Sequence, residues 1–207
     1  MFEHLQQYAG DPIFGLNDAF HRDSHPQKIN LTIGLYYDDA GRIPVLPSVA
    51  AVEAQLAANP VPRSYLPMEG LQAYRDGVQR MVFGEGNALV AEGKIATIQT
   101  LGGTGALKVG ADLLKLAYPE SEVWISDPAW DNHHSIFRGA GLATHSYPYY
   151  DKATKGLAFD AMIECLRGLP SLTIVLLHPC CHNPTGVDLS REQWGQVIEV
   201  VQERGLI

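Results

Sequence analysis

The chain has 207 residues, of which 46% are hydrophobic and 18% are charged, values that are typical of a globular protein with one or two domains. Acidic residues outnumber basic ones by 23 to 15, and the resulting net charge of −8 argues against a nucleic-acid-binding surface. No apolar run approaches the roughly 18 residues that a membrane span needs, so we expect no membrane partner.

The cysteine content indicates a reducing compartment. There are three cysteines, an odd number, and two of them are adjacent, so they do not form a disulfide framework. The first residues also lack the basic and apolar segments of a signal peptide. We therefore expect a cytoplasmic protein.

The first part of the chain combines irregular stretches with a few regular ones. Residues 1 to about 28 are polar and irregular apart from one possible short helix. Apolar residues then recur at strand-like or helical spacing in three segments. The predicted elements are a helix near 16–22, a strand over 29–36, and helices over 49–58 and 71–83.

A regular β/α rhythm begins near residue 94. Strands are predicted over 95–100, 123–126, 144–147 and 173–178. Helices are predicted over 106–117, 131–139, 159–166 and 191–204. This alternation indicates βαβ units and a mainly parallel sheet with flanking helices, hence an α/β fold. Residues 148–156 are predicted to be a long surface turn.

The first polar motif follows the strand predicted at 95–100. Gly102, Gly103 and Thr104 precede the next helix, where glycines allow backbone N–H groups to approach an anion and the helix N-terminus favours negative charge. The motif predicts a phosphate cradle or, equally, a plain glycine-rich turn. It matches neither a dinucleotide-binding fingerprint nor a P-loop, and Glu122 is poorly placed to bind a ribose.

A second motif follows the strand predicted at 123–126. Trp130 lies just past the strand end, where its indole could stack on a planar ligand or belong to the core. His133 and His134 are adjacent, so at most one of them can face a site at this position.

The third motif closes the apolar strand predicted at 173–178. Polar groups at the carboxyl end of such a strand lie where open α/β sheets bind ligands. The turn Asn-Pro-Thr-Gly at 183–186 predicts that Asn183 is held rigidly. His178, Cys180, Cys181 and His182 are too close in sequence to share one tetrahedral metal, so no metal site is expected. The two cysteines, which follow a buried strand, are expected to be inert core thiols.

Together the three motifs resemble the class I aminotransferases, the pyridoxal-phosphate enzymes of fold type I. Gly-Gly-Thr-Gly-Ala-Leu, Ser-Asp-Pro-x-Trp-x-Asn-His and His-Pro-Cys-Cys-His-Asn-Pro-Thr-Gly occur in the order and approximate spacing of that family. The resemblance extends from Asp11 to Ile207. It implies pyridoxal 5′-phosphate as cofactor and an amino acid and a 2-oxo acid as substrates.

The same resemblance assigns cofactor contacts to particular residues. Gly103 and Thr104 are implied to hold the cofactor phosphate, with Gly102 beside them. Trp130 is implied to stack on the pyridine ring, and Asn183 to donate to the 3-oxygen of that ring.

Other implied contacts concern the substrate and a second subunit. Gly34 lies on the segment that lines the substrate side, and Trp130 and Asn183 also border the substrate. Tyr65 is implied to reach the cofactor phosphate of the partner subunit in a homodimer. His133 and His178 are implied to lie near the carboxylate that pairs with the ring nitrogen.

Within the family the chain resembles the bacterial aromatic-amino-acid aminotransferases. Leu35, Tyr37 and Ile43 match that branch, whereas the aspartate-preferring branch has valine, lysine and threonine there. A bulkier apolar rim suits a phenol or indole side chain. The implied reaction is amino-group transfer between an aromatic amino acid and a 2-oxo acid such as 2-oxoglutarate. The alternative is an aspartate aminotransferase.

The resemblance also implies that this chain is the N-terminal half of a longer enzyme. Residues 1–44 correspond to an N-terminal arm and part of the small domain, and residues 45–207 to an incomplete large cofactor-binding domain. The lysine that forms the Schiff base is expected beyond Ile207, and Lys108 does not replace it. We therefore expect the fragment itself to be inactive. The other hypotheses are a nucleotide-dependent α/β protein and a non-catalytic half-protein.

Overall fold

A computed structural model describes residue 3 and residues 12–32 and 34–207. The chain divides into two compact units, Met1–Ser64 and Tyr65–Ile207. The predicted boundary between the small and the large domain, at residues 44 and 45, stays a prediction.

The described residues of the N-terminal unit form two helices, α1 (Pro12–Arg22) and α2 (Pro47–Ala58). The strand predicted over 29–36 is wrong for the described residues 29–32 and 34–36, and residue 33 lies outside them. A strand is defined by pairing with a neighbour, and this extended segment pairs with no other strand among the described residues.

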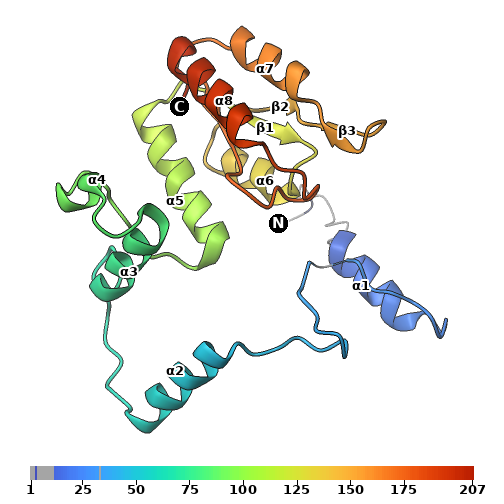
Figure 1. Ribbon diagram of the computed structural model, residues 1–207, viewed down its shortest axis with the longest axis vertical. Coiled ribbons are helices and arrows are strands. Elements are labelled where there is room, and N and C mark those ends of the chain that lie inside the picture. The colour runs from blue at the N-terminus through green and yellow to red at the C-terminus, as the bar shows by residue number, and fades with distance from the viewer. Residues whose placement is uncertain (1–2, 4–11, 33) are drawn as a thin grey trace. The chain divides into compact units, whose positions relative to one another are not determined.

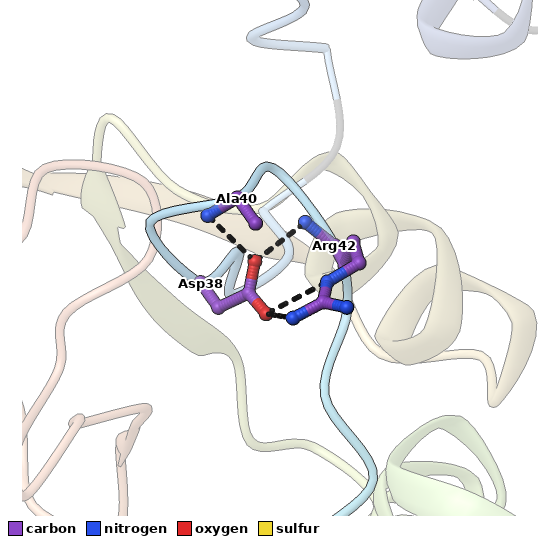
Figure 2. A network of polar contacts seen from close by, with 3 residues as sticks. All are labelled: Asp38, Ala40 and Arg42. Atoms are coloured by element: carbon purple, nitrogen blue, oxygen red, sulfur yellow. Dashed lines mark hydrogen bonds and ion pairs between the residues drawn. The ribbon is translucent and has the colours of Figure 1, made fainter.

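A tight turn of this unit is fixed by one carboxylate (Figure 2). Asp38 Oδ1 accepts from the backbone N–H groups of Ala40 at 3.0 Å and Arg42 at 2.8 Å, and the Arg42 guanidinium donates to Oδ2. The backbone N–H of Arg42 and the other hydrogen bonds lower the pKa of Asp38. The turn thus fixes the backbone between the 34–37 segment and residue 43.

The C-terminal unit is built on a parallel sheet. Its strands are β1 (Val123–Asp127), β2 (Thr144–Pro148) and β5 (Ile174–Val175), in the order β2-β1-β5. Val123 pairs with Thr144 on one side and with Ile174 on the other, and both ladders are parallel. The predicted parallel β/α arrangement is confirmed for this part of the chain.

Six helices and a small hairpin complete the unit (Figure 1). The helices are α3 (Gln72–Phe83), α4 (Ala88–Ala91), α5 (Gly102–Ala117), α6 (Asp131–Gly139), α7 (Phe159–Gly168) and α8 (Arg191–Arg204). The hairpin pairs β3 (Tyr150–Asp151) with β4 (Gly156–Leu157), so the predicted surface turn over 148–156 is partly a hairpin.

Alternation along β1 separates two apolar cores. Val123 and Ile125 are fully buried among residues of α5 and α6, whereas Trp124 packs against the core that α7 and α8 share with β2. Successive side chains of a strand point to opposite faces. The sheet is therefore covered by α5 and α6 on one face and by α7 and α8 on the other.

Helix α8 shows how local sequence sets an element's limits. The Ser190 hydroxyl accepts from the backbone N–H of Gln193, whose side chain accepts from the backbone N–H of Ser190, a reciprocal capping box. Gly205 ends the helix with φ of 61°, in the left-handed region that glycine adopts without a Cβ clash.

Two strand predictions in this unit need correction. Residues 95–100 do not form a strand. Their described backbone–backbone hydrogen bonds are those from Gln99 N–H to Glu69 O and from Gly102 N–H to Thr100 O, and neither belongs to a ladder between strands. The strand predicted over 173–178 is real and parallel but is limited to Ile174 and Val175. In both places the apolar pattern indicated extended chain, and pairing decided how much of it is a strand.

No helix in the described ranges, 12–32 and 34–207, combines the length and apolar character required to cross a membrane.

The core on the α7 and α8 side gives a direct test of packing. Leu166 in α7 is fully buried, so Leu166→Ala should lower the free energy of unfolding by about 2–5 kcal/mol through lost burial and a residual cavity. Leu116→Ala in α5, where the side chain is 82% exposed, is the matched control and should change it by less than about 0.5 kcal/mol. Urea unfolding of both variants measures this, and equal losses would contradict the core assignment.

Candidate active site

The candidate site lies at the carboxyl edge of the parallel sheet. Since β1 and β5 are parallel, the loops that follow them leave the same edge. A direct contact confirms this proximity: the Ser126 hydroxyl at the end of β1 lies 2.9 Å from His182 Nε2 in the loop after β5. Two of the three motifs of the sequence therefore meet in space.

Five aromatic rings run in series through this edge. The ring centroids of Trp130 and His133 are 5.3 Å apart, those of His133 and His178 are 5.2 Å apart, and both pairs are edge-to-face. The His178 and His182 centroids are 4.7 Å apart, and His182 stacks on Tyr149 at 3.8 Å with an interplanar angle of 12°. Trp130 is half-buried, so the indole is not simply a core residue.

His133 carries a buried polar atom without a partner. Its side chain is buried, and no hydrogen-bond partner for Nδ1 exists among the described residues. Burial, followed by the neighbouring His178, lowers the pKa of His133 to about 4, so the ring is neutral near pH 7. A buried polar atom without a partner costs free energy, which favours an additional group at this place.

Asn183 stands in a turn that is held at several points. Its backbone N–H donates to His178 Nδ1 at 3.1 Å, and the Gly186 N–H donates to His182 O at 2.7 Å. Gly186 has φ of 66°, which the turn requires and glycine supplies. Asn183 is exposed and described without a side-chain hydrogen bond, so its amide is free to meet a ligand.

The loop before Asn183 is held by Asp188. Its carboxylate accepts from the backbone N–H groups of Cys181 and His182, both at 2.8 Å. These two hydrogen bonds lower the pKa of Asp188, and the bond from the His182 N–H has the larger effect. Cys180 and Cys181 are exposed, so the expectation of core thiols is wrong for both. The buried strand ends before them, and the loop turns their side chains outward.

The N-terminus of α5 offers a site for an anion. The helix has 16 residues, begins at Gly102, has no side-chain cap and no acidic residue in its first turn. The first N–H groups of a helix have no intrahelical acceptor, and the exposed Gly103 and Thr104 leave theirs open. Lys108 forms an ion pair with Asp112 one turn further along.

This N-terminus points toward the carboxyl edge of the sheet. Helix α5 leads through residues 118–122 into the amino end of β1, so it runs opposite to the strands and begins at their carboxyl side. It also packs against α6, which starts directly after Trp130. A groove of about 560 Å³ lies beside it; its lining is mostly apolar and suits an apolar side chain better than a phosphate.

The structure does not test the roles of two further predicted residues. Tyr65 is fully exposed and makes no described side-chain contact, as a side chain that serves another subunit could. Gly34 belongs to the N-terminal unit. The assigned roles of both residues stay predictions.

Two residues of the cluster were not predicted to have a role. The sequence motifs point to His182 only as a candidate metal ligand, and they do not include Tyr149. The spacing of His178 and His182 with a turn after them could have indicated a paired ring contact. The described residues contain no group of three or more histidine, cysteine or acidic side chains placed to hold a metal.

Comparison with known proteins identifies the family. Residues 26–207 match the family described as aminotransferase class I and II. The chain is a member of this family. It is 53% identical to the aromatic-amino-acid aminotransferase of Escherichia coli K12, covering 100% of this chain and 52% of the relative. It is 48% identical to an aspartate aminotransferase of Pseudomonas aeruginosa, covering 99% of this chain and 52% of the relative.

A solved relative of this aminotransferase family member confirms the fold class. The aromatic-amino-acid aminotransferase of Burkholderia pseudomallei, described as covalently bound to pyridoxal phosphate, superposes with a TM-score of 0.96 at 48% identity. The match covers 100% of this chain and 52% of that protein. The predicted fold type I is thereby confirmed, and the chain spans about half the length of the relatives it matches.

The buried histidines predict a pH dependence of stability. Burial lowers the pKa of both His133 and His182 to about 4 from 6.5, so the unfolded chain binds more protons between these values. The two neutral histidines should therefore contribute fully to the free energy of unfolding above pH 6.5. This free energy should decrease as the pH is lowered toward 4. Urea unfolding at several pH values measures this.

The matched variants are His182→Gln and His25→Gln, the latter at an exposed position. The first should reduce the slope of unfolding free energy against pH between 6.5 and 4, and the second should keep it. A wild-type free energy that is constant over this window would contradict the buried neutral histidines.

Proposed function

We propose that this chain is the pyridoxal 5′-phosphate-binding half of an aminotransferase acting on aromatic amino acids and a 2-oxo acid such as 2-oxoglutarate. The observation that carries the proposal is that Trp130, His133 and Asn183 come together at the carboxyl edge of the sheet. The N-terminus of α5 points toward this edge. Family membership favours it over a nucleotide-dependent protein.

The residues present fit this cofactor by their chemistry. The free N–H groups of Gly103 and Thr104 and the Thr104 hydroxyl suit a phosphate, with Gly102 allowing close approach. The half-buried Trp130 indole offers a face to a pyridine ring, and the free Asn183 amide offers a donor to a ring oxygen. The unpartnered Nδ1 of His133 leaves a polar position open near that ring.

When bound, pyridoxal phosphate supplies an electron sink for the electrons released at the substrate Cα. The residues of this chain would bind and orient it. His178 contributes by accepting from the Asn183 backbone N–H, which fixes the backbone that carries the donor amide. Burial, followed by His178, lowers the pKa of His133 to about 4, so this ring stays neutral. Proton transfer at the substrate is assigned to no residue of this chain.

The aromatic preference rests on the N-terminal unit and on the relatives. Leu35, Tyr37 and Ile43 are exposed and apolar, and they stand near Gly34 in sequence, on the side proposed to face the substrate. Aspartate aminotransferases are also similar to the chain, at 48% and 43% identity, against 53% for the aromatic enzyme of Escherichia coli. Aspartate transfer is therefore the second candidate.

We also place the enzyme in the cytoplasm as a homodimer with shared active sites. The exposed Tyr65 supports a side chain that serves a second subunit, and the free cysteines support a reducing compartment. A half-protein that only binds or dimerises is the alternative.

Cofactor binding by the chain itself tests the proposal. Isothermal titration calorimetry with pyridoxal 5′-phosphate, and separately with inorganic phosphate, distinguishes the residues that bind the phosphate from those that bind the pyridine ring. Thr104→Val should weaken the binding of both ligands, because the Thr104 hydroxyl is proposed to donate to the phosphate. Asn183→Ala should weaken the binding of the cofactor only, by roughly 10- to 150-fold, since a hydrogen bond to a charged oxygen is worth roughly 1.5–3 kcal/mol.

Asn59→Ala, in the N-terminal unit, is the control and should bind both ligands as the wild type does. No cofactor binding by the wild-type chain, or equal loss of both ligands in Asn183→Ala, would contradict the assignment.

Substrate preference can be tested in a chimera. Residues 1–207 would replace the matching half of the Escherichia coli aromatic-amino-acid aminotransferase. Changing Leu35, Tyr37 and Ile43 to valine, lysine and threonine removes roughly 60 Å² of apolar contact, worth about 1.5 kcal/mol. The ratio of kcat/KM for phenylalanine over that for aspartate should fall about tenfold. An unchanged ratio would remove these three residues from the choice of substrate.

A further inference from the structure

His182 joins two loops through one directional series of hydrogen bonds. The Val187 backbone N–H donates to Thr185 Oγ1 at 3.1 Å, and Thr185 Oγ1 lies 2.8 Å from His182 Nδ1. His182 Nε2 lies 2.9 Å from Ser126 Oγ, and that hydroxyl donates to Pro128 O at 3.1 Å. The series runs from the loop after β5 to the loop after β1.

The Pro128 carbonyl and the neutral ring of His182 fix the direction of the hydrogen bonds at Ser126 and His182. A carbonyl oxygen only accepts, so the single hydroxyl proton of Ser126 is used on Pro128 O. Ser126 Oγ must then accept from His182, which places the proton of the ring on Nε2. Nδ1 of the neutral ring is an acceptor and receives the Thr185 hydroxyl proton, while Thr185 Oγ1 accepts from Val187 N–H.

The surroundings of His182 favour this single arrangement. The residue is 2% exposed and its ring stacks on Tyr149, so the ring is shielded from water. Its backbone N–H donates to Asp188, and its carbonyl accepts from Gly186 N–H. Burial lowers the pKa of His182 to about 4, in agreement with a neutral ring.

We propose that His182 is a positioning residue that, as the neutral Nε2–H tautomer, locks the loop carrying Trp130 to the turn carrying Asn183. Pro128 lies two residues before Trp130, and His182 directly precedes Asn183. Its value for positioning rests on the proposed function, since that function gives Trp130 and Asn183 a common ligand. The lock itself is a property of this chain without any ligand.

The tautomer is measured on the uniformly 15N-labelled wild-type chain. A two-bond 15N–1H correlation spectrum at pH 7 should show a protonated Nε2 and an unprotonated Nδ1 for His182. An Nδ1–H tautomer, or a doubly protonated ring, would overturn the proposal. This measurement needs no substitution at His182, so it remains decisive if a variant fails to fold.

The connection between the two loops is tested with two substitutions of His182, and the readouts are two resonances outside His182. His182→Phe keeps a ring to stack on Tyr149 but has no donor or acceptor, whereas His182→Gln places an amide donor near Ser126. The first should displace the resonances of both the Trp130 indole N–H and the Asn183 side-chain amide. The second should restore both toward their wild-type positions.

Unmoved resonances in folded His182→Phe would overturn the proposal, as would equal displacement in the two variants. All these readouts are taken without cofactor. If the chain passes them but does not bind pyridoxal 5′-phosphate, the proposed function fails and the joining of the two loops by His182 stands.

Discussion

The buried hydrogen bond between Ser126 and His182 is the interaction on which the candidate site depends. Ser126 is the penultimate residue of β1, and His182 lies in the loop after β5, 56 residues later. Parallel pairing brings the two strand ends to one edge, and this bond holds their loops together there. The contact of His133 with His178, whose Nδ1 accepts from the Asn183 backbone N–H, brings Trp130 and Asn183 together at the same edge.

The site combines a rigid apolar frame with polar groups left free. Cores on both faces of the sheet hold β1, and Asp188 and His182 hold the loop around Asn183. The N–H groups of Gly103 and Thr104, the Asn183 side-chain amide and His133 Nδ1 have no protein partner among the described residues. Free polar groups on a fixed frame are what a preorganised ligand site requires.

The sequence predicted the parts of this site better than their connections. The parallel sheet and the helices α6, α7 and α8 followed from the alternation of strand-like and helical segments along the sequence. The strands at 29–36 and 95–100 were wrong because apolar extended chain says nothing about whether a neighbour pairs with it. The outward position of Cys180 and Cys181 depends on where β5 ends, which periodicity did not give. The role of His182 depends on a contact across 56 residues, which no local pattern contains.

The most direct test of the account is a crystal structure of the chain with pyridoxal 5′-phosphate. The account predicts the phosphate at the N–H groups of Gly103 and Thr104, the pyridine ring on the face of Trp130, and the Asn183 amide within hydrogen-bond distance of the ring 3-oxygen. It also predicts that the Ser126–His182 bond is retained. A phosphate bound away from the start of α5, or a ring that does not contact Trp130 and Asn183, would contradict it.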